Sequence, residues 1–213
     1  SPASGPLPVG MLGSLPADKA FVRDLEAAKK HLAACKYKPE EFTLELSWVG
    51  EVPIEERFAL LMQANFAEIG IKSEVKKIPW ALFSEQVTKP ENTPNISQVY
   101  VNAVTGDPDT LVYNMYHSSA AGTWQSPEYL KDAKVDELLD KGRSETDDAA
   151  RAKIYEELSS RLRELSPTIF GYDQKAVYAA SKRVSVPALS GDPATAFSLN
   201  GMGFTFRLME MTE

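Results

Sequence analysis

The sequence contains very little cysteine or histidine. Cys35 is the single cysteine among 213 residues, and His31 and His117 are the two histidines. One cysteine cannot form an internal disulfide framework, and this set cannot supply a cysteine-based zinc cluster. We therefore expect no metal site and no cofactor.

Positive charge and long apolar runs are also scarce. The chain has 23 Lys and Arg against 30 Asp and Glu, a net charge of −7, whereas a dedicated nucleic-acid binder normally presents a basic face. Nucleic acid is therefore excluded as a partner. No apolar run approaches the roughly 20 residues of a membrane helix. No signal peptide opens the sequence, which on its own suggests a cytoplasmic protein or a fragment of a longer one.

Common catalytic motifs are absent as well. The sequence has no G-x-S-x-G elbow, no G-x-x-x-x-G-K-[ST] phosphate loop and no H-E-x-x-H zinc helix. The neighbouring acids at 107/109 and 147/148 lie at predicted helix starts, where acids favour the positive end of the helix dipole. We predict no catalytic residues and keep a stand-alone α/β enzyme, a hydrolase or transferase, as the alternative.

The clearest pattern lies in residues 42–78. Alternating apolar residues over 42–48 predict a strand with one buried face, and Pro53 suits the first turn of a helix that ends at Gly70. Residues 71–78 predict a second strand. Strand, helix and strand in this order predict a right-handed, parallel βαβ unit.

Similar patterns predict the remaining elements of an α/β fold. An apolar stripe predicts a helix over 17–36 that buries Cys35, and Thr146 is the expected N-cap of a helix over 147–165. The other predicted elements are helices at 80–88, 109–116 and 135–142 and strands at 96–103, 169–172, 176–180 and 204–208.

Aromatic side chains gather around the small residues 118–122. Rings with polar tips suit a cleft that stacks on a ligand and hydrogen-bonds to it. The same rings could instead pin a loop over the core, and the sequence leaves both interpretations open. The residues concerned are Tyr113, Tyr116, His117, Thr123, Trp124 and Tyr129.

Several short motifs share the order and spacing of a known family. They are the helix AAKKHLAACKY at 27–37, the segment FAEIGIK at 66–72, Asp107-Pro108-Asp109-Thr110, and a block running from Val135 to Tyr155. From about residue 5 to about residue 186, the chain resembles the C-terminal half of the family 5 extracytoplasmic solute-binding proteins. These are the oligopeptide-, dipeptide- and nickel-type receptors of ABC importers.

The resemblance implies the ligand-binding lobe of a type-II periplasmic-binding-protein-like fold, with a mixed or parallel sheet flanked by helices. Residues 1–16 would be a linker from a missing lobe, 17–172 the α/β C-terminal lobe, and 173–213 crossing-back strands and a tail that pack on the missing N-terminal lobe. It also implies a periplasmic or extracytoplasmic location, a signal peptide in the missing part, permease subunits as membrane partners, and a monomer.

The resemblance further implies where a solute binds. Peptide-binding members hold the ligand's ammonium group with an acid just before the D-P motif, and the matching residue here is Val104. Asn102 and Thr105 can hydrogen-bond but cannot neutralise an ammonium group. We therefore expect a sugar, an opine or a modified peptide as ligand, although the peptide class stays open. A sensor or chaperone-like module with the same lobe is a further alternative. The expected ligand-binding residues are Asn102, Val104, Thr105, Asp107, Tyr116, His117 and Trp124.

Overall fold

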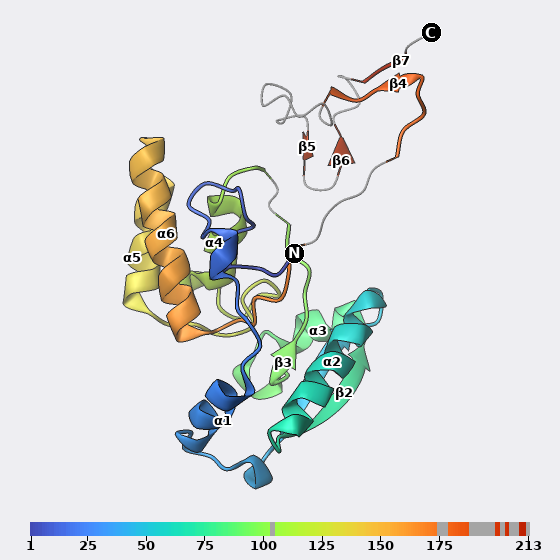
Figure 1. Cartoon of the computed structure of the whole chain (residues 1–213), viewed down its shortest axis with the longest axis vertical. Helices are drawn as coiled ribbons and strands as arrows, with labels where there is room; N and C mark the ends of the chain where they lie inside the picture. Colours follow the sequence, from blue (N-terminus) through green and yellow to red (C-terminus); the bar gives the residue numbers. More distant parts are fainter. Residues whose placement is uncertain (103–104, 174–178, 188–198, 201–202, 205–208, 212–213) are drawn as a thin grey trace. The chain divides into compact units, whose positions relative to one another are not determined.

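The chain divides into two compact units, each formed by separate stretches of sequence. The computed structural model describes residues 1–102, 105–173, 179–187, 199–200, 203–204 and 209–211. Unit 1 comprises Ser1–Phe21, Val101–Ser119 and Leu130–Glu213, and unit 2 comprises Val22–Tyr100 and Ala120–Tyr129 (Figure 1).

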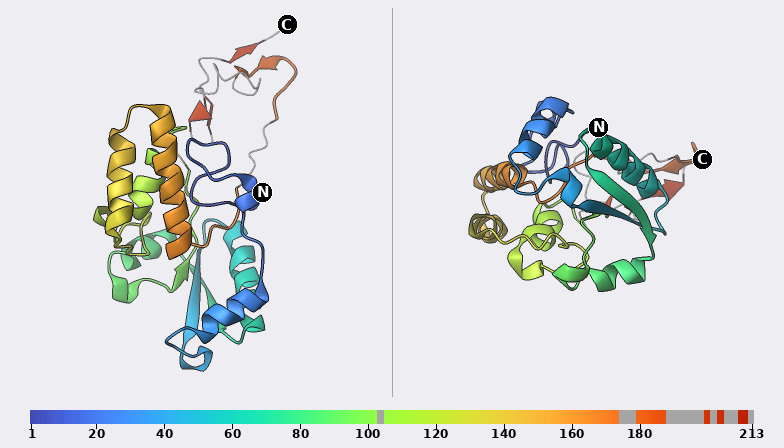
Figure 2. Two further views of the ribbon diagram at one scale, coloured as in Figure 1. Left: turned by 60° about the vertical axis from the view of Figure 1, so that its left-hand side comes forward. Right: turned by 90° about the horizontal axis from the view of Figure 1, so that it is seen from below.

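Unit 2 contains a parallel sheet. Strand β1 (Thr43–Val49) pairs in parallel with β2 (Lys72–Ile78) along its whole length, from Thr43↔Lys72 to Val49↔Ile78. Helix α2 (Ile54–Glu68) connects them and packs against both (Figure 2). Strand β3 (Ile96–Ser97) pairs in parallel with the other edge of β1, which gives the order β2-β1-β3. The predicted βαβ unit is confirmed.

The burial of β1 differs from the single buried face that we predicted. Leu46, Ser47, Trp48 and Val49 are all buried. The carboxyl half of β1 is thus buried on both faces. Helix α2 packs against β1, and Val49 belongs to a buried apolar cluster with Ile78, Phe83 and Val87. Helix α2 ends as predicted at Gly70, whose φ of +83° favours glycine.

The predicted helix over residues 17–36 is wrong in its extent. The structure has a 3-10 turn at Ala17–Lys19 and then helix α1 (Leu25–Ala33), which begins where the Asp24 side chain accepts a hydrogen bond from the Ala27 N–H. Cys35 lies beyond the end of α1 and is exposed. The apolar stripe failed because α1 buries none of its residues. His31 is exposed.

The rest of unit 2 consists of short elements around the sheet. Helix α3 (Trp80–Gln86) confirms the predicted helix after β2. Single 3-10 turns lie at Pro39–Glu41 and Pro90–Asn92. Strand β3 is much shorter than the predicted 96–103, since its pairing with β1 covers only two residues.

Three helices form the core of unit 1. They are α4 (Asp109–Tyr116), α5 (Ala133–Ser144) and α6 (Asp148–Leu165), with α5 and α6 side by side (Figures 1 and 2). The N-cap of α6 is Asp147, which accepts the Ala150 N–H, and not Thr146 as predicted. The buried apolar residues of this core are Leu7, Leu111, Val112, Tyr116, Val135, Leu138, Leu139, Tyr155, Leu158 and Leu162.

Two glycines let the backbone of unit 1 approach Tyr155 closely. A Cβ on Gly13 would lie 2.4 Å from the Tyr155 Cβ and 2.7 Å from the Ala152 carbonyl oxygen, and Gly13 also has a φ of +73°. A Cβ on Gly142, in α5, would lie 2.8 Å from the Tyr155 ring. The opening segment and α5 are thus both seated against α6 at this tyrosine.

The chain after α6 contains only short strand pairs among the described residues. Strand β4 (Val184–Ser185) pairs antiparallel with β7 (Glu210–Met211), and β5 (Leu199–Asn200) with β6 (Gly203–Phe204). The predicted strand 169–172 is wrong, since only an isolated bridge between Tyr172 and Pro2 forms there. Residues 176–178 and 205–208 of the other predicted strands lie outside the described residues.

The α/β class and the helix-flanked parallel sheet are confirmed. Among the described residues, no helix combines the length and apolar character needed to span a membrane.

Candidate functional site

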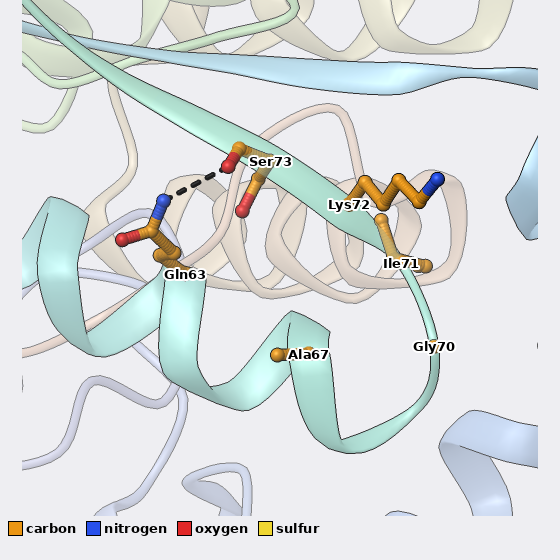
Figure 3. A pocket seen from close by; sticks show the side chains of 6 residues that line it. All are labelled: Gln63, Ala67, Gly70, Ile71, Lys72 and Ser73. Carbon is orange, nitrogen blue, oxygen red and sulfur yellow. Dashed lines mark hydrogen bonds between the residues drawn. The ribbon is translucent and has the colours of Figure 1, made fainter.

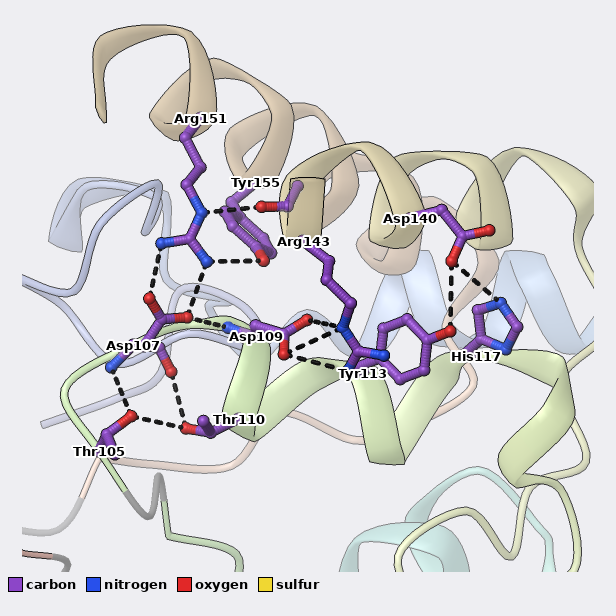
Figure 4. Close-up of polar contacts among 11 residues, drawn as sticks. Thr105, Asp107, Asp109, Thr110, Tyr113, His117, Asp140, Arg143, Arg151 and Tyr155 are labelled. Carbon is purple, nitrogen blue, oxygen red and sulfur yellow. Dashed lines mark hydrogen bonds and ion pairs between the residues drawn. The ribbon is translucent and has the colours of Figure 1, made fainter. Parts of the chain in front are cut away.

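Asp107 is neutralised within unit 1 by an arginine. Arg151 on α6 donates from Nη1 to Oδ2 at 2.6 Å and from Nη2 to Oδ1 at 2.8 Å (Figure 4). The same Oδ1 accepts the Asp109 N–H at 2.9 Å, and the Arg151 Nε donates to the Gly142 carbonyl oxygen at 2.7 Å. The hydrogen bond from Arg151 lowers the pKa of Asp107. This bidentate pair joins the start of α4 to α6.

A cation and two rings stack beside this pair. The Arg143 guanidinium lies 3.3 Å from the Tyr113 ring centroid and pairs with Asp109 at 3.0 Å. Tyr113 stacks on His117 with ring centroids 4.5 Å apart and an interplanar angle of 9°. The Tyr113 hydroxyl donates to Asp140 at 3.2 Å (Figure 4). Burial first, and then the charge of Asp140, raise the pKa of Tyr113.

The other predicted ligand-binding residues in unit 1 differ in exposure. Tyr116 is 1% exposed within the core, with its hydroxyl 3.3 Å from the Thr168 Oγ1. His117 contacts the Ser119 Oγ through Nδ1 at 2.7 Å. Asn102 and Thr105 are exposed, and the Thr105 Oγ1 accepts the Asp107 N–H at 3.4 Å. Val104 lies outside the described residues.

Trp124 belongs to unit 2. It packs against the buried cluster of Val49, Ile78, Phe83 and Val87 and makes an edge contact with Trp80, with ring centroids 5.3 Å apart. The Tyr129 hydroxyl donates to the Val87 carbonyl oxygen at 2.7 Å. The aromatic segment thus contributes to two different units, and its rings in each unit pack on an apolar core. A role for these rings in ligand binding stays a prediction.

An open depression lies where β1 and β2 end. It has a volume of about 430 Å³ and is lined by Gly50, Glu51, Lys77 and Pro79. Ligands of α/β proteins bind beyond the carboxyl ends of parallel strands. Sequence analysis missed Glu51 and Lys77, although their positions at the ends of two predicted parallel strands were a usable signal.

A second depression lies at the opposite end of β2. Its volume is about 330 Å³, and the Gln63 side chain crosses it to donate to the Ser73 carbonyl oxygen at 2.8 Å (Figure 3). Gly70, Ile71 and Lys72 complete its lining together with Ala67. This end of a parallel sheet is not where ligands usually bind. We therefore take the depression at Glu51 and Lys77 as the better candidate.

Both charged side chains of the better candidate site contact neighbouring residues. The Glu51 carboxylate accepts the Trp80 N–H, at 3.1 Å and 3.3 Å to its two oxygens. The Lys77 Nζ lies 5.3 Å from the centroid of the Trp48 ring, its register partner on β1. In the described part of the chain, no group of three or more His, Cys, Asp or Glu side chains could hold a metal ion. The site therefore offers charge and ring surface for a solute.

The sequence of this chain matches a class of solute-binding receptors. Residues 1–123 match the family described as bacterial extracellular solute-binding proteins, family 5 Middle. Since this match covers more than half of the chain, the chain belongs to that family. Binding proteins of this family are periplasmic or extracytoplasmic.

Three relatives show how far the similarity extends. Di/tripeptide-binding protein 4 of Pseudomonas aeruginosa (strain UCBPP-PA14) is 26% identical over 171 residues, which cover 79% of this chain and 32% of that protein. The structure of the PBP AgaA from A. tumefacien R10 in complex with agropinic acid is 28% identical, with a TM-score of 0.68 over 80% of this chain and 35% of that chain.

The third relative bears on the fold alone. The ABC transporter substrate-binding protein CtaP from Listeria monocytogenes is 19% identical, with a TM-score of 0.75 over all of this chain and 42% of that one. The match to di/tripeptide-binding protein 4 covers about a third of the length of that curated relative.

Proposed function

We propose that this chain is one segment of the solute-binding component of an ABC importer. Its membership of family 5 carries this proposal, and relatives named for binding di- and tripeptides or agropinic acid support it. The stand-alone enzyme has no support from these relatives, which are named as binding proteins. We also propose that residues 1–16 are the linker, 17–172 the lobe and 173–213 the crossing-back segment of the complete receptor.

The proposed mechanism is capture by closure. A solute is held between this lobe and a second lobe, and the closed state is favoured because some contacts to the solute exist only there. No covalent step is needed. The complete receptor, secreted with a signal peptide, then delivers the solute as a monomer to the permease subunits in the membrane.

This chain has no acidic residue just before the D-P motif to pair with the ammonium group of a peptide. The residue at that position is Val104, and the neighbouring Asp107 is already paired with Arg151. An opine, a sugar or a modified peptide therefore fits better than an unmodified peptide. Asn102, Thr105, His117 and Trp124 are partly or fully exposed and remain proposed contacts; Val104 and Tyr116 are proposed to shape the site.

The test is to identify the solute that the complete receptor carries. The receptor is purified without refolding, and native mass spectrometry identifies small molecules that leave on denaturation. Calorimetry then compares an unmodified dipeptide, a disaccharide and agropinic acid. Tight binding of the dipeptide alone would contradict the ligand class. Turnover of any bound solute would contradict the function itself.

A sensor that uses the same lobe is separated from a transport receptor by uptake. Deletion of the receptor gene should abolish uptake of the identified solute by cells. If uptake persists while a transcriptional response to the solute is lost, the protein acts as a sensor.

A further inference from the structure

Two opposite charges line the depression at the ends of β1 and β2 without pairing. Glu51 and Lys77 both line it, yet neither forms an ion pair within 4.0 Å with any described residue. In unit 1, by contrast, Asp107 and Asp109 are each paired with an arginine. The depression thus presents one anionic and one cationic group that are both available.

Both charged side chains are nevertheless held in place. The Trp80 N–H fixes the Glu51 carboxylate. Lys77 lies across Gly50, since a Cβ on Gly50 would come within 2.6 Å of the Lys77 Cε. The face of the Trp48 ring then attracts the Lys77 ammonium group. Positioned groups lose less conformational entropy on binding a ligand than freely moving ones.

A partly exposed aromatic residue, Trp80, follows the lining of this depression in sequence and donates its backbone N–H to Glu51. Trp80 follows Pro79, which lines the depression, and Trp80 is 39% exposed. Its edge contact with Trp124 and tilted contact with Phe83, with centroids 5.7 Å apart, hold the Trp80 ring in place. The ring can cover an apolar part of a ligand whose charged groups reach Glu51 and Lys77.

We propose that Glu51 and Lys77 bind a zwitterionic, amino-acid-type head group, with an ionised amine at Glu51 and a carboxylate at Lys77. This inference rests on the proposed function and narrows its ligand class. An opine that keeps an ionised amine and a carboxylate satisfies both charges. An unmodified peptide carries the same two groups, so the calorimetry described above, and not this head group, separates a peptide from an opine. A neutral sugar would leave both without a partner.

The test uses four probes that share one ring and differ in which of the two head-group charges they carry. They are phenylalanine, N-acetylphenylalanine, phenylalaninamide and N-acetylphenylalaninamide. Each is titrated into the ¹⁵N-labelled 213-residue chain, and the indole N–H signal of Trp80, assigned with a Trp80→Phe variant, reports binding. Phenylalanine should bind most tightly, and loss of either charge should weaken binding about fivefold, the upper range for an exposed ion pair.

Two variants assign each charge of the probe to one residue. In Lys77→Gln, phenylalanine and phenylalaninamide should bind alike, while the preference over N-acetylphenylalanine persists. In Glu51→Gln, phenylalanine and N-acetylphenylalanine should bind alike, while the preference over phenylalaninamide persists. The glutamine amide oxygen still accepts the backbone N–H of Trp80 but carries no charge. Lys72→Gln and Glu74→Gln make the same changes elsewhere on β2 and should leave all four affinities unchanged.

Three results would overturn the inference. They are equal binding of the four probes, unchanged preferences in Lys77→Gln and Glu51→Gln, and no response of Trp80 to any probe. The complete receptor distinguishes this failure from a failure of the proposed function. If the receptor holds a solute with the same affinity in wild type and in Lys77→Gln, only the head-group inference fails. If it holds no solute, the proposed function fails.

Discussion

One set of charged residues in each unit is arranged in the opposite way to the other set. In unit 1, Asp107 and Asp109 at the start of α4 are paired with Arg151 and Arg143 and join three helices. In unit 2, Glu51 and Lys77 at the ends of two strands are positioned but unpaired. Paired charges contribute to the stability of a fold, whereas unpaired charges remain available to a ligand. The two sets should therefore respond differently to mutation.

The largest effect is expected where the backbone of unit 1 approaches Tyr155. Gly13→Ala should destabilise the chain by about 3 kcal/mol, because the new Cβ collides with backbone and Tyr155 and the φ of +73° is unfavourable. Urea unfolding measures this change. Gly10→Ala is the matched control, because Gly10 also has a positive φ, of +96°, but its Cβ would meet no atom within 4 Å. A loss similar to that of the control would mean that the opening segment does not seat against α6.

The second effect concerns the paired charges directly. Arg151→Met should cost about 2 kcal/mol, since it leaves Asp107 and the Gly142 carbonyl oxygen without their partner. Because the Asp107 pKa is lowered by Arg151, the pair stabilises the fold above the ordinary pKa of aspartate, and this contribution disappears as the pH falls through the lowered pKa.

The control for this pair is on the same helix. Lys153→Met removes one exposed positive charge from α6 and should change the stability little. If the two variants unfold at the same urea concentration, the ion pair at Asp107 does not contribute to stability.

A third effect should appear as a dependence on pH. Burial raises the pKa of Glu128, in unit 2, to about 7. The folded state then holds this proton more tightly than the unfolded state does. The contribution of Glu128 to the free energy of unfolding is therefore fully present below pH 4.5 and is lost as the pH rises to about 7. The loss amounts to up to about 3 kcal/mol. Glu128→Gln should remove it, which thermal unfolding between pH 4 and about 8 can measure.

Glu85→Gln provides the reference for this measurement. Glu85 is an exposed glutamate on α3, and its variant should show the same pH dependence as the wild type. A Glu128→Gln protein whose stability still falls with rising pH would mean that another group causes the dependence.

The smallest effect is expected at the candidate site. Lys77→Gln and Glu51→Gln should each change the free energy of unfolding by less than about 0.5 kcal/mol, because neither charge has an ionic partner to lose. Urea unfolding again measures it. A loss as large as that of Arg151→Met would mean that these charges serve the fold, and the contrast between the two units would disappear.

Local patterns in the sequence predicted the framework better than the site. The strand β1, the helix ending at Gly70 and the parallel pairing of β2 follow from the local sequence and the order of the elements, although the burial of β1 on both faces does not. The exposure of Cys35 does not follow from the local sequence, because an apolar stripe does not show whether another element packs against the helix. The length of β3 depends on pairing with β1, which residues 96–103 do not encode by themselves.

The candidate site depended on contacts between residues distant in sequence. Asp107 was expected to face a ligand, but its partner Arg151 lies 44 residues away and only the fold brings them together. Glu51 and Lys77 meet at one depression for the same reason. The sequence showed which residues carry charge, while the fold determined which of those charges are neutralised.

The outer strand of the sheet has a further consequence for handling this protein. Strand β2 lies at one edge of the described sheet and carries Lys72, Glu74, Lys76 and Lys77, all exposed. An edge strand offers free backbone groups to other chains, and charged side chains, lysine above all, hinder the stacking of edges that starts aggregation. Loss of these charges would therefore favour intermolecular β-pairing at high concentration.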